Sequence, residues 1–368
     1  MTQKMSMMQI AEEFGGTKSQ VERLMKLYHI PVRSHSEAKR NCDRQEFEDR
    51  KVDEVEQLKS KISMFTPKVE FVPVTKKNML IPVPLDNKAR DATLTLVISD
   101  LHIGDSNHLP ETYWSTVSNV LEVIKNIQGF YKIKKFNLVL NGDITNGIEV
   151  YRNQEFNNLV QRPHWQVFAT EMIIKDTMRK LSELVNTNEI VLVRGTHDNM
   201  ANNLVMYLKR LLPGRVVYLS QGGIYNLGDD GVPYNILFMH GYGWSNSNPI
   251  TSKMFIDVNA IMEMNRARGV FIERVCTSHT HWLSSGLIMG SLYWDTTGGF
   301  QKWDGTINQR PCGFILYLYS DGEAVSIPIR PDLNVEMKEK ADPGLNYRNY
   351  SYYGNILLKH LKDVEGIE

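Results

Sequence analysis

Five apolar segments of this 368-residue sequence each end in acidic, imidazole or other polar residues. The first segment, residues 94–98, is followed closely by Asp100 and His102. Residues i and i+2 of an extended chain point to the same side, so this carboxylate and this imidazole can face one point. Strand packing does not require an acid and a histidine there. A divalent metal ion does, because carboxylate oxygen and imidazole nitrogen are common metal ligands.

The same arrangement recurs four times further along the chain. Each later segment has the apolar, β-branched character of a buried strand, and its polar residues come directly after it. The pairs are 136–140 with Asn141-Gly142-Asp143, 189–193 with Arg194-Gly195-Thr196-His197-Asp198, 234–239 with His240-Gly241, and 270–277 with Ser278-His279-Thr280-His281. Open α/β sheets place their sites at the carboxyl ends of the strands. The five segments therefore predict one site.

These motifs, D-x-H, G-D, G-T-H-D, H and H-x-H, occur in the order typical of the calcineurin-like metallophosphoesterases, which the chain resembles over residues 93–329. The resemblance implies an α/β fold, a four-layer α/β/β/α sandwich with two facing sheets. It also implies two divalent metal ions, one held by Asp100, His102, Asp143 and His281, and one held by Asp143, Thr196, His240 and His279. Manganese is favoured for these mixed oxygen and nitrogen ligands, with zinc, iron and magnesium open.

The resemblance further implies a mechanism. Asp143 would bridge the two ions, and a hydroxide formed from a bridging water would attack the phosphorus atom. His197 would contact the scissile phosphate and protonate the leaving oxygen as a general acid. Asp198, next in the same motif, and Asn146, after the G-D motif, are the other catalytic positions that the resemblance assigns.

Three positions depart from the family pattern. Thr196 replaces an asparagine, and a hydroxyl is a poorer neutral ligand than an amide oxygen. We therefore expect the second metal ion to be bound more weakly, or Asn199 or water to take the ligand position of Thr196. Asn146 replaces an aspartate that orients the catalytic histidine, and an amide stabilises an imidazolium less than a carboxylate does. Ser278 replaces a glycine. Since all charged and imidazole ligands are present, we expect an active site.

The segment 141–154 suggests the substrate. It resembles the corresponding part of the exonuclease small subunit of archaeal DNA polymerase D, which is similar to the Mre11-type nucleases. Tyr151 and Trp165 could stack on the bases of a strand, although a lone tryptophan more often anchors a helix in the core. We therefore expect a metal-dependent phosphodiesterase that hydrolyses DNA, as an exonuclease or an endonuclease.

Two alternatives stay open. One is a phosphodiesterase or phosphatase that acts on small nucleotides or phosphoproteins. The other is a non-catalytic DNA-binding subunit on a degenerate phosphoesterase fold.

Residues 1–35 have the pattern of a helix-turn-helix. Apolar residues repeat at helical spacing on both sides of Gly15-Gly16, and Thr17 suits a helix N-cap. The segment resembles DNA-binding units of phage and mobile-element proteins, so DNA is the expected partner. Its candidate DNA-contacting residues are Lys18, Ser19, Gln20, Arg23 and Arg33. The alternative is a helical hairpin that packs on the catalytic domain or on a partner.

The remaining chain divides into three parts. Residues 36–91 combine a charged helix, as a spacer or a pairing helix for a homodimer, with a proline-containing linker. Residues 92–330 form the catalytic domain, with helices expected at 113–127, 165–185 and 203–212. Residues 331–368 form a tail with a short helix near 352–361, which we expect to dock on the domain or on a partner.

Composition sets the remaining bounds. The formal net charge is zero, so any basic surface for nucleic acid must be local. The three cysteines form neither a metal-ligand spacing nor an even disulfide set, which suits a reducing cytoplasm. Because neither a signal-peptide pattern nor an apolar run of membrane-spanning length occurs, we expect a cytoplasmic protein without a membrane span.

Overall fold

The computed structural model describes residues 89–151, 154–228, 232–241, 250, 252–288, 292–302 and 310–365. All of them belong to one structural unit, Met79–Glu368. The helix-turn-helix and the charged helix predicted from the sequence lie outside the described residues. So do the candidate DNA-contacting residues Lys18, Ser19, Gln20, Arg23 and Arg33.

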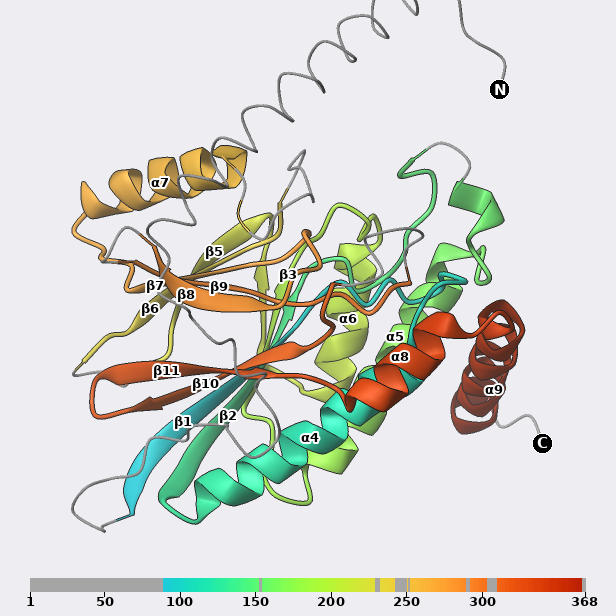
Figure 1. Cartoon of the computed structure of the whole chain (residues 1–368), viewed down its shortest axis with the longest axis horizontal. Coiled ribbons are helices and arrows are strands. Elements are labelled where there is room, and N and C mark those ends of the chain that lie inside the picture. Colours follow the sequence, from blue (N-terminus) through green and yellow to red (C-terminus); the bar gives the residue numbers. More distant parts are fainter. Residues whose placement is uncertain are drawn as a thin grey trace, which may run out of the picture. The chain divides into compact units, whose positions relative to one another are not determined.

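The described part of the chain contains eleven strands in two sheets (Figure 1). The first sheet has the order β11-β10-β1-β2-β3-β4, in which β1 to β4 are parallel and β10 and β11 are antiparallel to their neighbours. Its strands are β1 (Arg90–Ile98), β2 (Tyr131–Asn141), β3 (Glu189–Val193), β4 (Val216–Leu219), β10 (Phe314–Ser320) and β11 (Glu323–Ile329).

The second sheet has the order β5-β6-β7-β9-β8. Its three central strands are parallel, and each edge strand pairs antiparallel with its neighbour. The strands are β5 (Gly222–Asn226), β6 (Asn235–Met239), β7 (Arg274–Thr277), β8 (Ser284–Ile288) and β9 (Leu292–Thr296).

Helices cover the outer faces of both sheets. α4 (Pro110–Gln128), α5 (Pro163–Leu181) and α6 (Ala201–Leu211) lie on the first sheet, and α7 (Ser252–Arg266) lies on the second. α4 and α5 both begin with proline, whose fixed φ suits the first helical position and whose missing N–H costs nothing there. The 3₁₀ turn η2 (Gln154–Phe156) precedes α5, and α8 (Leu333–Ala341) and α9 (Leu345–Glu365) follow the last strand. None of the described helices combines the length and the apolar character that crossing a bilayer requires.

β1 shows how the sequence produces the layers. Successive side chains of a strand point to opposite faces. Leu94 and Leu96 pack with the helices outside the first sheet, whereas Val97 packs with Phe238 and Tyr317 between the two sheets. The layers are therefore helices, sheet, sheet and helix, and the predicted four-layer α/β/β/α sandwich is confirmed.

The predicted helices at 113–127, 165–185 and 203–212 correspond to α4, α5 and α6. The predicted strand 270–277 is extended in the sheet only over Arg274–Thr277. α7 was not predicted, because only Met254 and Val258 of this helix are buried and its apolar periodicity is weak. The predicted C-terminal helix near 352–361 extends over the whole of Leu345–Glu365, and α8 precedes it.

Candidate metal centre

The carboxyl ends of five strands meet at one place, and each end carries residues selected in the sequence. β1, β2 and β3 belong to the first sheet, and β6 and β7 belong to the second. The residues brought together there are Asp100, His102, Asp143, Thr196, His197, His240, His279 and His281. Backbone hydrogen bonds join neighbouring loops, for example from His102 N to Asp143 O at 3.0 Å.

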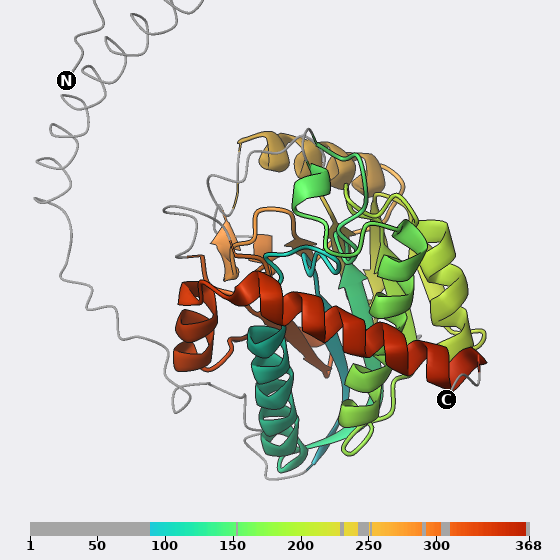
Figure 2. The same cartoon turned by 90° about the vertical axis from the view of Figure 1, so that its right-hand side faces the viewer.

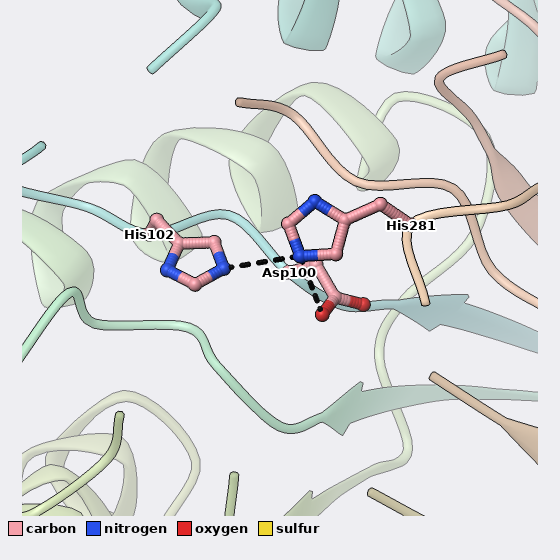
Figure 3. A group of neighbouring side chains, drawn as sticks. All are labelled: Asp100, His102 and His281. Carbon is pink, nitrogen blue, oxygen red and sulfur yellow. Dashed lines mark hydrogen bonds and ion pairs between the residues drawn. The ribbon is translucent and has the colours of Figure 1, made fainter. Parts of the chain in front are cut away.

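Asp100, His102 and His281 form the first group of ligand atoms (Figure 3). The two Nε2 atoms of His102 and His281 lie 3.3 Å apart, and His281 Nε2 lies 3.3 Å from Asp100 Oδ1. All three side chains are buried. Burial lowers the pKa of His102 to about 3 and the pKa of His281 well below its usual value. Both rings are therefore neutral at pH 7, with nitrogen lone pairs that can bind a cation.

The carboxyl group of Asp100 also indicates that the first group binds a cation. Burial raises its pKa from 3.8 to about 7, so its ionised form is costly in the protein alone. Two donors partly compensate for this cost, because the side-chain hydroxyl of Ser99 and the backbone N–H of His279 donate to the carboxylate. A divalent cation between this carboxylate and two neutral imidazoles would stabilise the ionised form, so the first group fits a metal ion.

Asp143, His240 and His279 form the second group. His240 Nε2 lies 2.9 Å from Asp143 Oδ2, and the rings of His240 and His279 are 5.3 Å apart. Burial lowers the pKa of His240, but the charge and hydrogen bond of Asp143 outweigh it and raise the pKa to about 9. Burial likewise raises the pKa of Asp143, yet the charge of His240 holds it well below its usual range. Asp143 therefore favours a positive charge beside it, and a metal ion bound there would replace the proton on His240.

Asp143 lies between the two groups and is the carboxylate that both can share. Its Oδ1 accepts a hydrogen bond from His197 N at 2.7 Å, and its Oδ2 accepts one from Thr196 Oγ1 at 3.1 Å. The ligand atoms of His102, Asp143 and His197 also lie within 4.8 Å of one another. His197 is half-buried, and its ring centroid is 4.6 Å from that of His102.

The backbone at these ligands is strained. Seven non-glycine residues of the described chain have positive φ, and five of them are Asp100, His102, Asp143, His279 and His281, with φ between 48° and 81°. L-residues rarely adopt this region, and each instance costs of order 1–3 kcal/mol. Such strain persists where the surrounding structure enforces it, typically at functional sites. It marks the same residues that the ligand geometry selects.

Two glycines permit close packing against the ligand histidines. A Cβ at Gly142, where φ is +83°, would lie 2.3 Å from His240 Nδ1. A Cβ at Gly299 would lie 2.4 Å from His281 Nδ1. Both rings therefore rest directly on backbone, which fixes their position.

Comparison with known proteins identifies this arrangement. A family model described as calcineurin-like phosphoesterase matches residues 93–287, which is more than half of the chain. The chain belongs to this family. Members of the calcineurin-like phosphoesterases bind divalent metal ions, and the two groups of ligand atoms agree with that property. No curated protein matches the sequence of this calcineurin-like phosphoesterase.

Several solved structures resemble the chain in fold. A single mutant of Vps29 from Entamoeba histolytica has 16% identity and a TM-score of 0.32, and the match covers 65% of this chain and 99% of that one. A novel archaeal phosphodiesterase has 13% identity and a TM-score of 0.34, covering 64% and 99%. The 5'-nucleotidase from Candida albicans has 8% identity and a TM-score of 0.38, covering 75% and 58%.

The other predicted positions of this calcineurin-like phosphoesterase lie close to the ligands. The side-chain Oδ1 of Asn146 lies 3.2 Å from Nδ1 of His102. Its backbone carbonyl oxygen lies 2.8 Å from Nδ1 of His197. The sequence had suggested that its amide would orient His197. Asp198 is buried, and its carboxylate accepts hydrogen bonds from the backbone N of Thr145 and Gly195, both at 2.9 Å. It therefore fixes two loops around the site.

Ser278, Asn199 and Gly299 complete the comparison with the sequence. Ser278 Oγ lies 2.7 Å from His240 Nδ1 and donates to the carbonyl of Asn141, so this departure from the family pattern orients a ligand. Asn199 is exposed, and its amide donates to Ile148 O at 2.7 Å. Sequence analysis missed Gly299, which belongs to none of the five motifs and contacts His281 only through the fold.

Proposed function

We propose that this phosphoesterase is a metal-dependent phosphodiesterase that hydrolyses DNA. Its metal centre would consist of Asp100, His102, Asp143 and His281 on one side and Asp143, Thr196, His240 and His279 on the other. Two divalent ions, with manganese favoured, would supply Lewis acidity at the phosphoryl oxygens and lower the pKa of water. The observation that carries the proposal is the position of Asp143 between two convergent groups of ligand atoms, most of them buried.

His197 is the proposed general acid. The backbone carbonyl of Asn146 accepts a hydrogen bond from Nδ1, which leaves Nε2 on the opposite side of the ring. As an imidazolium, His197 would donate the Nε2 proton to the leaving oxygen while Nδ1 stays hydrogen-bonded. The hydrogen bond from His197 N to Asp143 ties its backbone to the metal centre, so the ring is placed next to the site of attack.

The choice of DNA as substrate is supported by two exposed aromatic side chains of residues 151–156, one of which lies beside His197. The ring centroid of Tyr151 lies 5.9 Å from that of His197, and 43% of Tyr151 is exposed. Phe156, in the same loop region, is 80% exposed. Bases of a single strand stack on such rings, with about 1–3 kcal/mol per base. Trp165, in contrast, is partly buried against the core and so acts as a helix anchor.

The test is cleavage of labelled single- and double-stranded DNA with manganese by the wild type, His197→Ala and His164→Ala. His164 is an exposed histidine on α5 and serves as the matched control. We expect His197→Ala to lose activity by a factor of about 10²–10⁴, the contribution of a general acid, and His164→Ala to keep it. Tyr151→Ala should raise KM for DNA and leave hydrolysis of bis-p-nitrophenyl phosphate unchanged.

Three results would contradict the proposal in different ways. Hydrolysis of bis-p-nitrophenyl phosphate or nucleotides without DNA cleavage would favour a small-phosphoester enzyme. Bound manganese without any hydrolysis would favour a non-catalytic subunit. Unchanged DNA cleavage in His197→Ala would refute the role of this histidine.

A further inference from the structure

The C-terminal helix α9 is hydrogen-bonded to the loop that carries His102. This helix lies outside the residues matched to the family, 93–287, and it crosses α4 and α5 on the outside of the first sheet (Figure 2). Two fully buried side chains of α9, Asn349 and Tyr353, face the loop at residues 102–109. Neither contact belongs to the proposed ligand sets.

The contacts are specific. The hydroxyl of Tyr353 accepts a hydrogen bond from Gly104 N at 2.8 Å and lies 2.7 Å from His108 Nδ1. The tautomer of His108 sets the direction of this second hydrogen bond, and the hydroxyl donates where Nδ1 carries no proton. Burial lowers the pKa of His108 to about 3, so this ring is neutral and Nδ1 can accept. Asn349 Nδ2 donates to Ser106 O at 2.8 Å and to His108 O at 2.7 Å.

The loop depends on such partners because it forms neither a helix nor a strand ladder. Its internal backbone bonds are turns, from Asp105 N to His102 O at 3.0 Å and from His108 N to Asp105 O at 3.3 Å. At its start, Ile103 N donates to Ile144 O at 2.9 Å, which holds the loop against the Asp143 loop. Buried N–H and C=O groups need partners, and α9 supplies them for Gly104 N, Ser106 O and His108 O. The backbone of residues 157–160 and of Phe300 pairs with other N–H and C=O groups of the loop.

We propose that α9 is a positioning element of the metal centre, in which Tyr353 and Asn349 hold the 102–109 loop so that His102 faces His281 and Asp143. The inference rests on the proposed metal centre. Groups that orient metal ligands typically contribute 10–100-fold to metal affinity. A purely structural α9 would contribute to folding stability and leave the affinity of the folded protein unchanged.

The test compares Tyr353→Phe with Tyr352→Phe in the full chain. Tyr352 is the neighbouring residue, and its hydroxyl accepts from Trp114 Nε1 of α4 at 3.3 Å rather than from the loop. Manganese affinity is measured by isothermal titration calorimetry. We expect Tyr353→Phe to bind manganese about tenfold more weakly than the wild type and Tyr352→Phe to stay within about twofold. Asn349→Leu, which keeps the volume but removes the donor, should also weaken binding.

A second readout is independent of the metal. Amide hydrogen exchange at Gly104 in the metal-free protein should be faster in Tyr353→Phe than in Tyr352→Phe, because the acceptor of this N–H is removed. Unchanged manganese affinity in folded Tyr353→Phe, or equal exchange at Gly104, overturns the inference. If the wild type binds no manganese, the proposed metal centre is refuted and the inference with it. The exchange data then show only whether Tyr353 holds the loop through Gly104. Manganese binding without DNA cleavage refutes only the proposed substrate.

Discussion

Replacing Arg274 with methionine should destabilise the protein strongly, because it leaves a buried carboxylate without its counter-ion. Arg274 lies on β7, and its Nη1 is 2.8 Å from Asp295 Oδ2 on β9, with side-chain exposures of 3% and 0%. The pair also joins the two sheets. Arg274 donates to Ser326 Oγ and Ala324 O of β11 at 2.9 and 3.1 Å, and Tyr317 OH of β10 donates to Asp295 at 2.8 Å.

The magnitude follows from this burial. Removing one partner of a buried ion pair costs about 3–5 kcal/mol, because the other charge stays desolvated. With an unfolding entropy of about 2.1 cal/mol/K per residue over 368 residues, such a loss lowers the melting temperature by roughly 4–7 °C. In the double variant Arg274→Met/Asp295→Asn the charge is gone, and Asn can still accept from Tyr317, so at least half of the loss should be recovered.

The assay is thermal and urea unfolding of the wild type, Arg274→Met, the double variant and Lys253→Met. Lys253 pairs with Asp257 at 2.7 Å, nearly the same distance, but the two side chains are 55% and 35% exposed. Because an exposed pair contributes about 0–1 kcal/mol, Lys253→Met should change stability little. A loss below about 1 kcal/mol in Arg274→Met, or a double variant no more stable than the single one, would refute this account of the ion pair.

Two further predictions concern the metal centre. Gly299→Ala should displace the His281 ring and weaken manganese affinity at least about tenfold. Gly286→Ala should leave the affinity unchanged, because a Cβ at Gly286 meets nothing within 4 Å. Calorimetric titration of both variants tests this prediction. Manganese at a thousandfold excess over Kd should stabilise the chelator-treated wild type by about 4 kcal/mol and so raise its melting temperature. The melting temperature of Asp143→Asn should not change. Equal melting temperatures of the wild type with and without manganese would speak against a manganese centre.

The residues that gather at the site could be predicted from the sequence for a local physical reason, whereas the four layers were predicted from the resemblance to a family. Asp100 and Asp143 each come within a few residues of the end of an apolar run, and parallel strands bring their carboxyl ends to one edge. Strand patterning and the following polar residues are adjacent in the chain, so both can be recognised without knowledge of the tertiary structure. The same holds for α4 and α6, which have strong helical periodicity.

What the sequence could not give are contacts between distant segments. Tyr353 and Gly104 are 249 residues apart, and the sequence of the C-terminal tail predicted only that it docks on the domain or on a partner. Gly299 is one of 25 glycines, and nothing local distinguishes it from the others. Asn146 was recognised, yet which of its groups meets which histidine depends on the path of two separate loops.

The ion pair and the metal centre are connected through the arrangement of the two sheets. The first sheet supplies Asp100, His102 and Asp143, and the second supplies His240, His279 and His281. Each proposed metal ion therefore takes ligands from both sheets, and the separation of the sheets sets the distances between ligands. Arg274 hydrogen-bonds across this gap, and cores transmit strain because they are closely packed. We therefore expect side chains that fix the sheet separation to contribute to metal binding without contacting the metal.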